Sequence, residues 1–256
     1  MKALVTGASS GIGRDIAREL AKRNIDLIIV SRDEEKLNEV KNSISNVEIE
    51  VIAKDLSNAE NCKELYEQVK DKHIDILINN AGFGVFGKFT ESSLEKEINM
   101  VNTNVVAMHI LTKLFLQDMK NQNKGHILNV ASIAGFMPGP LMASYYASKA
   151  YVVRLTQALK EELNKEKSNV KLSVLCPGPV ATNFNNVANV KFSAKPLSSE
   201  YVAKYTVDKL LKGKFYIVPG ASIKAVRFFA KIIPDNLMAK MAYKAQKKKS
   251  DVTIHS

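Results

Sequence analysis

The chain has 256 residues, of which 46% are hydrophobic and 25% charged, so it can bury a sizeable core and shows no composition typical of disorder. Its net charge is +11, and residues 201–256 contribute +9 of it, from twelve Lys or Arg against three Asp. Because the rest of the chain is almost neutral, the composition excludes a general nucleic-acid binder and places the charge in a C-terminal segment.

Histidine and cysteine, the usual ligands of structural metals, have no suitable pattern here. The four histidines lack ligand spacing, and Cys62 and Cys176 lie far apart with no CxxC pair. We therefore expect no metal and a reduced, cytoplasmic protein. An apolar run at residue 3 leads directly into a glycine-rich segment, and no apolar stretch is long, so we expect neither a signal peptide nor a membrane span.

Short apolar strands alternate with amphipathic helices along the chain. Strands are predicted at residues 2–6, 26–31, 48–53, 75–79, 125–131, 170–176 and 215–218, and helices for example at 11–23, 93–119 and 143–164. Near-continuous apolar runs such as DLIIV are typical of parallel strands that helices cover on both faces. The pattern predicts one Rossmann-like, doubly wound α/β domain over residues 1–220, with residues 221–256 as a basic, amphipathic extension of it.

A glycine-rich turn, TGASSGIG at residues 6–13, follows the first predicted strand. Such a turn lets the backbone approach a pyrophosphate, and the helix that follows offers its N-terminal N–H groups and a positive dipole. A plain tight turn is the alternative. We expect the turn to bind a dinucleotide through Gly7, Ser9, Ser10, Gly11, Ile12 and Gly13.

The second predicted strand ends in Ser31, followed by Arg32. Sites that prefer NAD usually have an acid here, which binds the ribose 2′-hydroxyl. Serine does not repel a 2′-phosphate, and a guanidinium can bind it with two parallel hydrogen bonds. We therefore expect NADP(H) before NAD(H), with Ser9 and Ser10 assisting Arg32. Asp33 could weaken this preference, and Arg32 could instead be a solvated residue at the start of a helix.

Tyr145 and Lys149 are four residues apart in YYASK, and Ser132 lies thirteen residues before the tyrosine. This spacing puts Tyr145 and Lys149 on one face of a helix, whereas Tyr146 faces elsewhere. An ammonium one turn from a phenol stabilises the phenolate, and so lowers a pKa that is ordinarily about 10. A serine hydroxyl can donate to a substrate oxygen as negative charge develops on it.

In this order and spacing, TGASSGIG, Ser132 and YYASK resemble the classical short-chain dehydrogenase/reductase family from residue 1 to about residue 220. The glycines follow the family's TGxxxGxG spacing. The resemblance implies an oxidoreductase that interconverts a carbonyl and a secondary alcohol while a nicotinamide moves the hydride. It implies Tyr145 as acid/base, Ser132 as donor to the substrate oxygen and Lys149 as a ligand of the nicotinamide ribose too. Homodimers or homotetramers are typical of the family.

The same resemblance implies further site residues. A proton-relay asparagine is expected in the helix before Ser132, where Asn99, Asn102 and Asn104 compete and Asn104 best fits the family's motif. Asp55 could contact the adenine or simply cap a helix starting at Ser57. The remaining cofactor contacts are expected from Leu56 beside the adenine, from Asn80, Ala81 and Gly82 in NNAG, and from Pro177, Gly178, Val180 and Thr182 in PGPVAT.

Apolar side chains surround the expected substrate pocket, which favours a lipophilic carbonyl substrate of acyl, aliphatic or steroid-like type over a sugar. They are Phe83, Val85, Phe86, Phe136, Met137, Leu141, Met142 and Phe184. An NADP(H)-binding sensor without turnover is the alternative function, although a sensor needs no Ser-Tyr-Lys group. The basic extension, interrupted at Pro234, has two interpretations. We favour a helix pair that packs on the domain or on a second subunit over a segment that lies on an anionic membrane.

Overall fold

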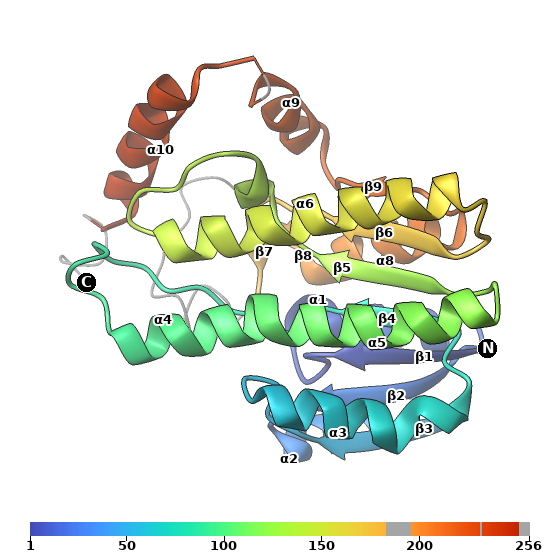
Figure 1. The fold of residues 1–256 in the computed structure, drawn as a ribbon. Coiled ribbons are helices and arrows are strands. Elements are labelled where there is room, and N and C mark those ends of the chain that lie inside the picture. Colours follow the sequence, from blue (N-terminus) through green and yellow to red (C-terminus); the bar gives the residue numbers. More distant parts are fainter. Residues whose placement is uncertain (183–195, 231, 251–256) are drawn as a thin grey trace.

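The computed structural model describes residues 1–182, 196–230 and 232–250, so Phe184 lies outside the described residues. Its centre is a seven-stranded sheet in the order β3-β2-β1-β4-β5-β6-β9, and every neighbouring pair is parallel (Figure 1). The strands are β1 (Lys2–Thr6), β2 (Asp26–Ser31), β3 (Ile49–Ala53), β4 (Ile76–Asn79), β5 (His126–Val130), β6 (Lys171–Leu175) and β9 (Tyr216–Ile217). The predicted fold class and the seven predicted strands are confirmed.

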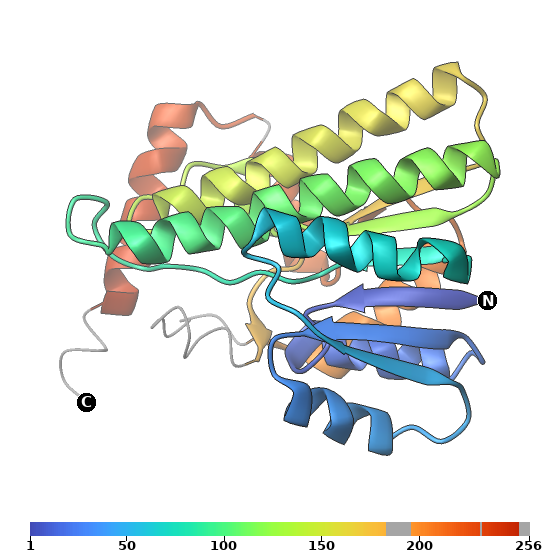
Figure 2. The same cartoon turned by 60° about the horizontal axis from the view of Figure 1, so that its bottom comes forward.

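Helices cover both faces of this sheet, as Figures 1 and 2 show. One face packs against α1 (Gly11–Ala21), α2 (Glu34–Asn42) and α8 (Ser199–Leu211), and the other against α3 (Ala59–Val69), α5 (Met108–Asn121) and α6 (Ala143–Lys165). Successive residues of β1 serve the two cores in turn: Val5 belongs to the first and Leu4 to the second. This alternation explains why the strands are apolar at nearly every position.

The helix predicted at residues 93–119 contains a wider turn. It starts as α4 (Leu94–Val101), widens into the π-helical turn η2 (Asn102–Ala107) and continues as α5. A π turn holds one more residue than an α turn, and such turns are frequent at functional sites. Here it carries Asn104, which is buried.

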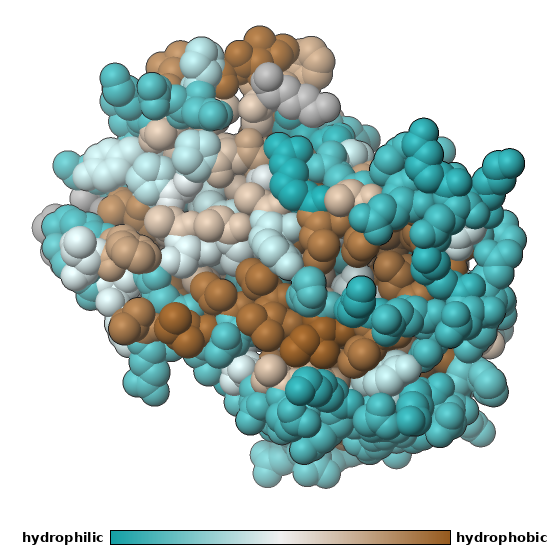
Figure 3. Space-filling model, in the orientation of Figure 1, coloured by the Kyte–Doolittle hydropathy of each residue, from teal (hydrophilic) through white to brown (hydrophobic). Residues whose placement is uncertain are grey.

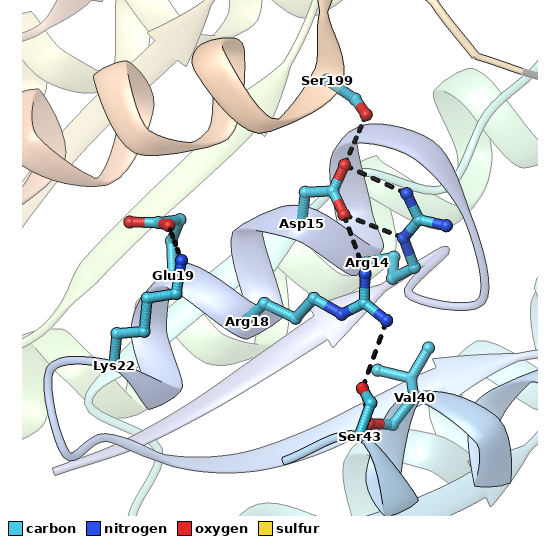
Figure 4. Close-up of polar contacts among 8 residues, drawn as sticks. All are labelled: Arg14, Asp15, Arg18, Glu19, Lys22, Val40, Ser43 and Ser199. Carbon is cyan, nitrogen blue, oxygen red and sulfur yellow. Dashed lines mark hydrogen bonds and ion pairs between the residues drawn. The ribbon is translucent and has the colours of Figure 1, made fainter.

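A buried carboxylate joins α1 to α8. Asp15 is 2% exposed, and Figure 4 shows it between Arg14, Arg18 and Ser199. The Arg14 Nε lies 2.8 Å from Asp15 Oδ1, and the Ser199 hydroxyl donates to Asp15 Oδ2. Ser199 is the first residue of α8, so this bond fixes where α8 begins relative to α1.

The C-terminal segment forms α9 (Ala221–Phe229) and α10 (Asp235–Ser250), which follow a small parallel pair, β7 (Val180–Ala181) and β8 (Leu197–Ser198). Arg227 of α9 stacks on Tyr216 of β9, with its guanidinium carbon 3.5 Å from the ring centroid. Gln246 of α10 is 2% exposed and donates to the Tyr146 hydroxyl over 2.7 Å. These contacts agree with the favoured interpretation, a helix pair that packs on the domain. None of the described helices combines the length and hydrophobicity needed to cross a bilayer.

Candidate active site

The glycine-rich turn after β1 is tied to the end of β4. Asn80 donates its side-chain amide to the Thr6 oxygen at 3.0 Å and to the Gly7 oxygen at 3.1 Å. The Thr6 hydroxyl accepts from the backbone N–H groups of Asn80 and Ala81 at 3.0 and 3.1 Å. These hydrogen bonds hold the turn in shape, and the side chains of Asn80 and Thr6 each make two of them.

The start of α1 has the form of an anion site. Gly7 has a φ of +65°, and a Cβ at Gly13 would lie 2.3 Å from the Gly7 oxygen, so both positions require glycine. Ser10 is the N-cap residue, but its side chain makes no capping hydrogen bond, and the first turn contains no acid. The first N–H groups of α1 are therefore open to an anion, which fits the pyrophosphate of a dinucleotide.

The PGPVAT segment after β6 reaches the same turn. A Cβ at Gly11 would lie 3.0 Å from Thr182 Cγ2, so the absence of a side chain at Gly11 makes room for Thr182. Val180 is buried at the start of β7, and Gly178 packs against Ile223 of α9 so closely that a Cβ there would lie 2.3 Å from Ile223 Cδ1. The segments predicted to bind the pyrophosphate and the nicotinamide thus meet beside α1.

Arg32 and Asp33 follow β2 in different environments. Arg32 is exposed and, within the described residues, makes no hydrogen bond or ion pair. Asp33 caps α2 by accepting from the Lys36 N–H at 3.1 Å, and it also pairs with the Lys36 ammonium, which lowers the pKa of the Asp33 carboxyl. Asp33 is therefore bound to its own helix, while the guanidinium beside it is open to solvent.

Asp55 does not cap the helix that follows it. The cap of α3 is Asn58, which accepts from the Glu60 N–H at 2.8 Å. Asp55 instead accepts from the Ser57 N–H at 3.0 Å in a local turn. Leu56 is 5% exposed and packs in the core, so a ligand could meet its backbone but hardly its side chain.

Helix α6 brings Tyr145 and Lys149 together beside Ser132. Ser132 follows β5 and is hydrogen-bonded to the Tyr145 hydroxyl. The Lys149 ammonium lies 5.9 Å from the centroid of the Tyr145 ring and donates to the Val130 oxygen at 3.0 Å. Because Val130 is the last residue of β5, this bond holds Lys149 against the same strand end that carries Ser132.

Burial controls the acidity of this pair, and the expected lowering of the Tyr145 pKa is wrong for the chain by itself. Burial raises the pKa of Tyr145 to about 12, although the Ser132 hydrogen bond acts in the opposite direction. Burial also lowers the pKa of Lys149 to about 8. Desolvation disfavours the charged form of both groups and is the largest cause of each shift. At neutral pH the phenol consequently keeps its proton.

Two glycines set the distance between α6 and the loop after Ser132. A Cβ at Gly135, in the short 3₁₀ helix Ile133–Phe136, would lie 2.6 Å from the Lys149 oxygen. A Cβ at Gly139 would lie 2.1 Å from the ring of Tyr146. The loop therefore rests directly on the backbone and on one ring of α6.

Asn104 is the asparagine that faces the site. Its side chain accepts from the Phe83 N–H at 3.0 Å and donates to the Phe83 oxygen at 2.9 Å and to Ser148 Oγ at 3.1 Å. A Cβ at Gly82 would lie 2.7 Å from Asn104 Oδ1 and 3.4 Å from the Lys149 ammonium, so this loop passes close to both side chains. Asn99 and Asn102, the competing candidates, line a depression on the outside of α4.

The residues expected in the pocket wall divide into two groups. Met142 is 4% exposed and packs with Phe86, Tyr145 and Tyr146. Phe136 belongs to a different cluster, because its ring lies 6.2 Å from that of Tyr216 on β9. Gln246 was not predicted, because it reaches Tyr146 from 100 residues away and no local pattern points to it.

The cysteines and potential metal ligands add no further chemistry. Burial raises the pKa of Cys62 to about 11 and that of Cys176 to about 12, so neither thiol is a nucleophile at neutral pH. Among residues 1–182, 196–230 and 232–250, no three His, Cys, Asp or Glu side chains gather in a way that could hold a metal ion.

Comparison with known proteins finds that this chain is similar to short-chain dehydrogenases in sequence and in structure. A family model described as short chain dehydrogenase matches residues 1–191. The ketoacyl reductase HetN from Nostoc sp. is 35% identical over 213 residues, which are 82% of this chain and 73% of HetN.

Two solved structures are similar over most of their length. One is a short chain dehydrogenase/reductase from Burkholderia phymatum in complex with NAD, with a TM-score of 0.80, 29% identity and coverage of 88% of this chain and 91% of the other. The second is a short-chain dehydrogenase from Sphingobium yanoikuyae in complex with NADPH, with a TM-score of 0.83, 27% identity and coverage of 90% and 92%.

Proposed function

The chain belongs to the short-chain dehydrogenase family, and we propose that within it the protein is an NADP(H)-dependent enzyme that interconverts a ketone and a secondary alcohol. Membership makes it an oxidoreductase with a nicotinamide cofactor. The choice of NADP(H), the type of substrate and the roles of individual residues are our proposal. The observation that carries it is the Ser132–Tyr145 hydrogen bond with the Lys149 ammonium close to the same ring.

In this proposal the bound nicotinamide supplies the hydride for reduction or accepts it in the reverse reaction. Tyr145 donates its phenolic proton to the carbonyl oxygen, and Ser132 donates a hydrogen bond to the same oxygen. The raised pKa of Tyr145, about 12, keeps it a proton donor at neutral pH. Lys149, whose pKa is about 8, is mostly charged at pH 7 and stabilises the phenolate that remains. Asn104 acts as the relay residue through which a new proton arrives.

The preference for NADP(H) rests on the end of β2. The exposed Arg32 guanidinium has no competing partner within the described residues, and the neighbouring carboxylate of Asp33 is engaged by Lys36. A 2′-phosphate beside Arg32 would therefore meet one positive charge without an opposing acid. Ser9 is partly exposed and Ser10 is exposed, which lets either hydroxyl assist.

The proposed substrate is a lipophilic carbonyl compound, of acyl, aliphatic or steroid-like type. The side chains that pack around Tyr145 are Phe86, Met142 and Tyr146, which offer apolar surface and one hydroxyl. The similarity to HetN, a ketoacyl reductase, supports an acyl substrate within this class.

The proposal is tested by following NADPH oxidation at 340 nm against ketones of graded length and shape, with NADH in parallel. We expect turnover of the lipophilic ketones and a preference for NADPH. Turnover of small polar carbonyls alone would contradict the substrate class, and a preference for NADH would contradict the role of Arg32. Tight NADPH binding without turnover of any member of the panel would favour the alternative, an NADP(H) sensor.

We also propose that the protein is a cytoplasmic homodimer or homotetramer. Both cysteines are free and buried, as suits a reducing compartment. Leu94 and Ile98 on α4 are 76% and 52% exposed, and Tyr151 on α6 is 38% exposed, so these long helices offer apolar surface to a second subunit. Sedimentation velocity on the purified protein tests the oligomeric state, and a monomer would contradict it.

A further inference from the structure

Seven large apolar side chains of α9, α10 and the turn between these helices are exposed. Figure 3 shows brown side chains at the top of the molecule, where α9 and α10 meet in Figure 1. A soluble surface usually scatters such side chains singly, and a contiguous group marks an interaction site. Those exposed by 40–63% are Val226, Phe228, Phe229, Ile232, Leu237, Met241 and Tyr243.

The same surface is strongly basic. Residues 221–250 contain eight Lys or Arg and a single acid, Asp235. Lys224, Lys240, Lys244 and Lys247 are exposed. A depression of about 480 Å³ on α10 combines both characters, because it is lined by Leu237, Ala239, Lys240, Met241, Tyr243 and Lys244. Whatever covers this face must therefore accept apolar side chains and carry negative charge.

The contacts that hold α9 and α10 on the domain use other side chains. Ile223 packs against Gly178, Arg227 stacks on Tyr216, and Gln246 bonds to Tyr146. Met238 of α10 is 8% exposed and faces inward with them. The helix pair thus has an inner side that meets the active-site loops and an outer side that the described part of the chain leaves uncovered.

We propose that this outer side docks onto an anionic lipid surface, with the apolar side chains in the interfacial region and the lysines at the headgroups. Helices that expose apolar side chains beside lysines are typical of segments that lie in the plane of an anionic membrane, because the lysine stems reach to the headgroups. A second copy of the chain is a poorer occupant, because pairing this face with itself would bring lysines against lysines. The docking does not depend on the proposed reaction.

Docking in this way would place the active-site loops near the lipid. Gln246 connects α10 to Tyr146, the neighbour of Tyr145, and Ile223 connects α9 to the segment after β6. A lipophilic substrate could then pass from the bilayer to the site without crossing bulk water. This consequence, unlike the docking, rests on the proposed function.

The first test is co-sedimentation of the full chain with vesicles of phosphatidylcholine, alone or with about 30% phosphatidylglycerol as the anionic lipid. We expect binding to the anionic vesicles only, and weaker binding at high salt. Replacing three apolar side chains together (Phe228→Ser, Phe229→Ser, Leu237→Ser) should reduce binding by at least about tenfold, since the buried apolar area sets its strength. The paired change Lys240→Gln with Lys244→Gln should reduce it by a similar factor.

Matched controls come from other surfaces of the same chain. Tyr201 and Leu211 on α8 are 48% and 43% exposed, so Tyr201→Ser with Leu211→Ser removes comparable apolar surface elsewhere. Lys113→Gln with Lys204→Gln removes the same charge from other exposed sites. Both controls should bind vesicles like the unchanged protein. NADPH binding confirms that each variant is folded.

A second test uses a reporter that does not disturb the fold. The chain contains no tryptophan, so Phe229→Trp introduces a single tryptophan, which can be excited selectively over the eight tyrosines, at a position that is 55% exposed. We expect its emission to shift to shorter wavelength with anionic vesicles and to be quenched by brominated lipid, whereas Tyr201→Trp should show neither change.

Three results would overturn the docking. They are the absence of sedimentation with anionic vesicles at low salt, equal binding by the apolar triple variant, and an emission spectrum of the Phe229→Trp variant that anionic vesicles leave unchanged. A change in oligomeric state on the apolar substitutions, without vesicle binding, would assign the face to a second copy instead.

Discussion

The carboxyl edge of the sheet and the C-terminal helix pair differ in where their polar side chains find partners. At the sheet edge, buried polar side chains bind one another: Asn79 donates to Thr112 and Asn129, at 3.0 and 2.9 Å, and Asn129 donates to Thr156 at 3.0 Å. In α9, by contrast, no residue is fully buried, and the Arg227 Nε lacks a partner within the described residues. The first region pairs most of its buried polar groups internally, although the Asn79 Oδ1 has no partner within the described residues, whereas the second exposes apolar and charged side chains.

This difference predicts which region tolerates change. Removing one member of a buried, paired network leaves its partner unsatisfied and is costly. Removing an exposed side chain of α9 or α10 costs the fold little, so its effect should be seen in an interaction. The two adjacent tyrosines of YYASK allow the sharpest comparison, because both lie in α6 and only Tyr146 is hydrogen-bonded to α10.

The largest effect is expected for Tyr145→Phe, which removes the proposed proton donor. Turnover should fall about 1,000-fold, within the range of general acid catalysis, while the Kd for NADPH stays nearly constant. Tyr146→Phe is the matched control, because it loses only the Gln246 hydrogen bond, and its turnover should stay within about threefold. Steady-state kinetics and NADPH titration measure both, and equal losses in the two variants would remove the distinction between the regions.

The next effect concerns His126, at the amino end of β5 and 8% exposed, whose ring lies 2.8 Å from Ser173 Oγ. Burial lowers its pKa to about 4 from the ordinary 6.5. As pH falls from 6.5 to 4 the unfolded chain gains a proton there that the folded chain does not, so stability is lost in this window, by about 3 kcal/mol.

The loss in the free energy of unfolding is measured by urea unfolding at about pH 7.5, above this window, and at about pH 4.5, near its lower end. His126→Gln should show a smaller decrease in the free energy of unfolding between the two pH values than the unchanged protein. His109→Gln, at an exposed position on α5, should behave like the unchanged protein. An equal pH dependence in all three would show that His126 does not couple protonation to the sheet.

A smaller effect is expected for Arg32→Ala. Losing a charged hydrogen-bonding partner of a phosphate should raise the KM for NADPH about 10- to 30-fold and leave that for NADH within about threefold. Lys41→Gln, at an exposed position of the same helix α2, is the control, and its KM for NADPH should stay within about threefold. An equal rise in the KM for NADPH and for NADH would show that Arg32 does not bind the 2′-phosphate.

The smallest effect should come from Gln246→Leu, which cuts the contact between the two regions. We expect the KM for a bulky ketone to change by about two- to fivefold and the KM for NADPH to stay constant. The double variant with Tyr146→Phe should add nothing beyond the single changes, because both remove the same bond. Full additivity would show that the two side chains act independently.

Most of the fold was predictable from local sequence patterns. The seven strands were predictable because each is apolar on both sides, a signal that needs no knowledge of the partners. The π turn at Asn102–Ala107 was not, because one additional residue in a helix leaves the apolar pattern nearly unchanged. The pair β7 and β8 was missed because these two-residue strands lie in no longer apolar run, unlike the equally short β9, which lies in FYIV.

The site was predictable only as far as spacing reaches. The four-residue step from Tyr145 to Lys149 determines their common face, and the structure brings Ser132 to them from β5. The direction of the Tyr145 pKa shift was wrong in the prediction because burial depends on the whole fold. The Gln246 contact had no local signal at all, and the roles of the site residues stay predictions.

Gly135 and Gly139 lie directly against α6, and this close contact affects how the substrate specificity of the protein could evolve. Because bare backbone sets this distance, the reacting groups keep their arrangement whatever side chains occupy the rest of the loop. Met137 and Leu141 lie between or beside these glycines and are only partly buried. Selection for a new substrate can therefore exchange Met137 readily, and Leu141 within the limits of its φ of +66°, while a mutation of either glycine would be removed, so specificity and chemistry can evolve separately within one short loop.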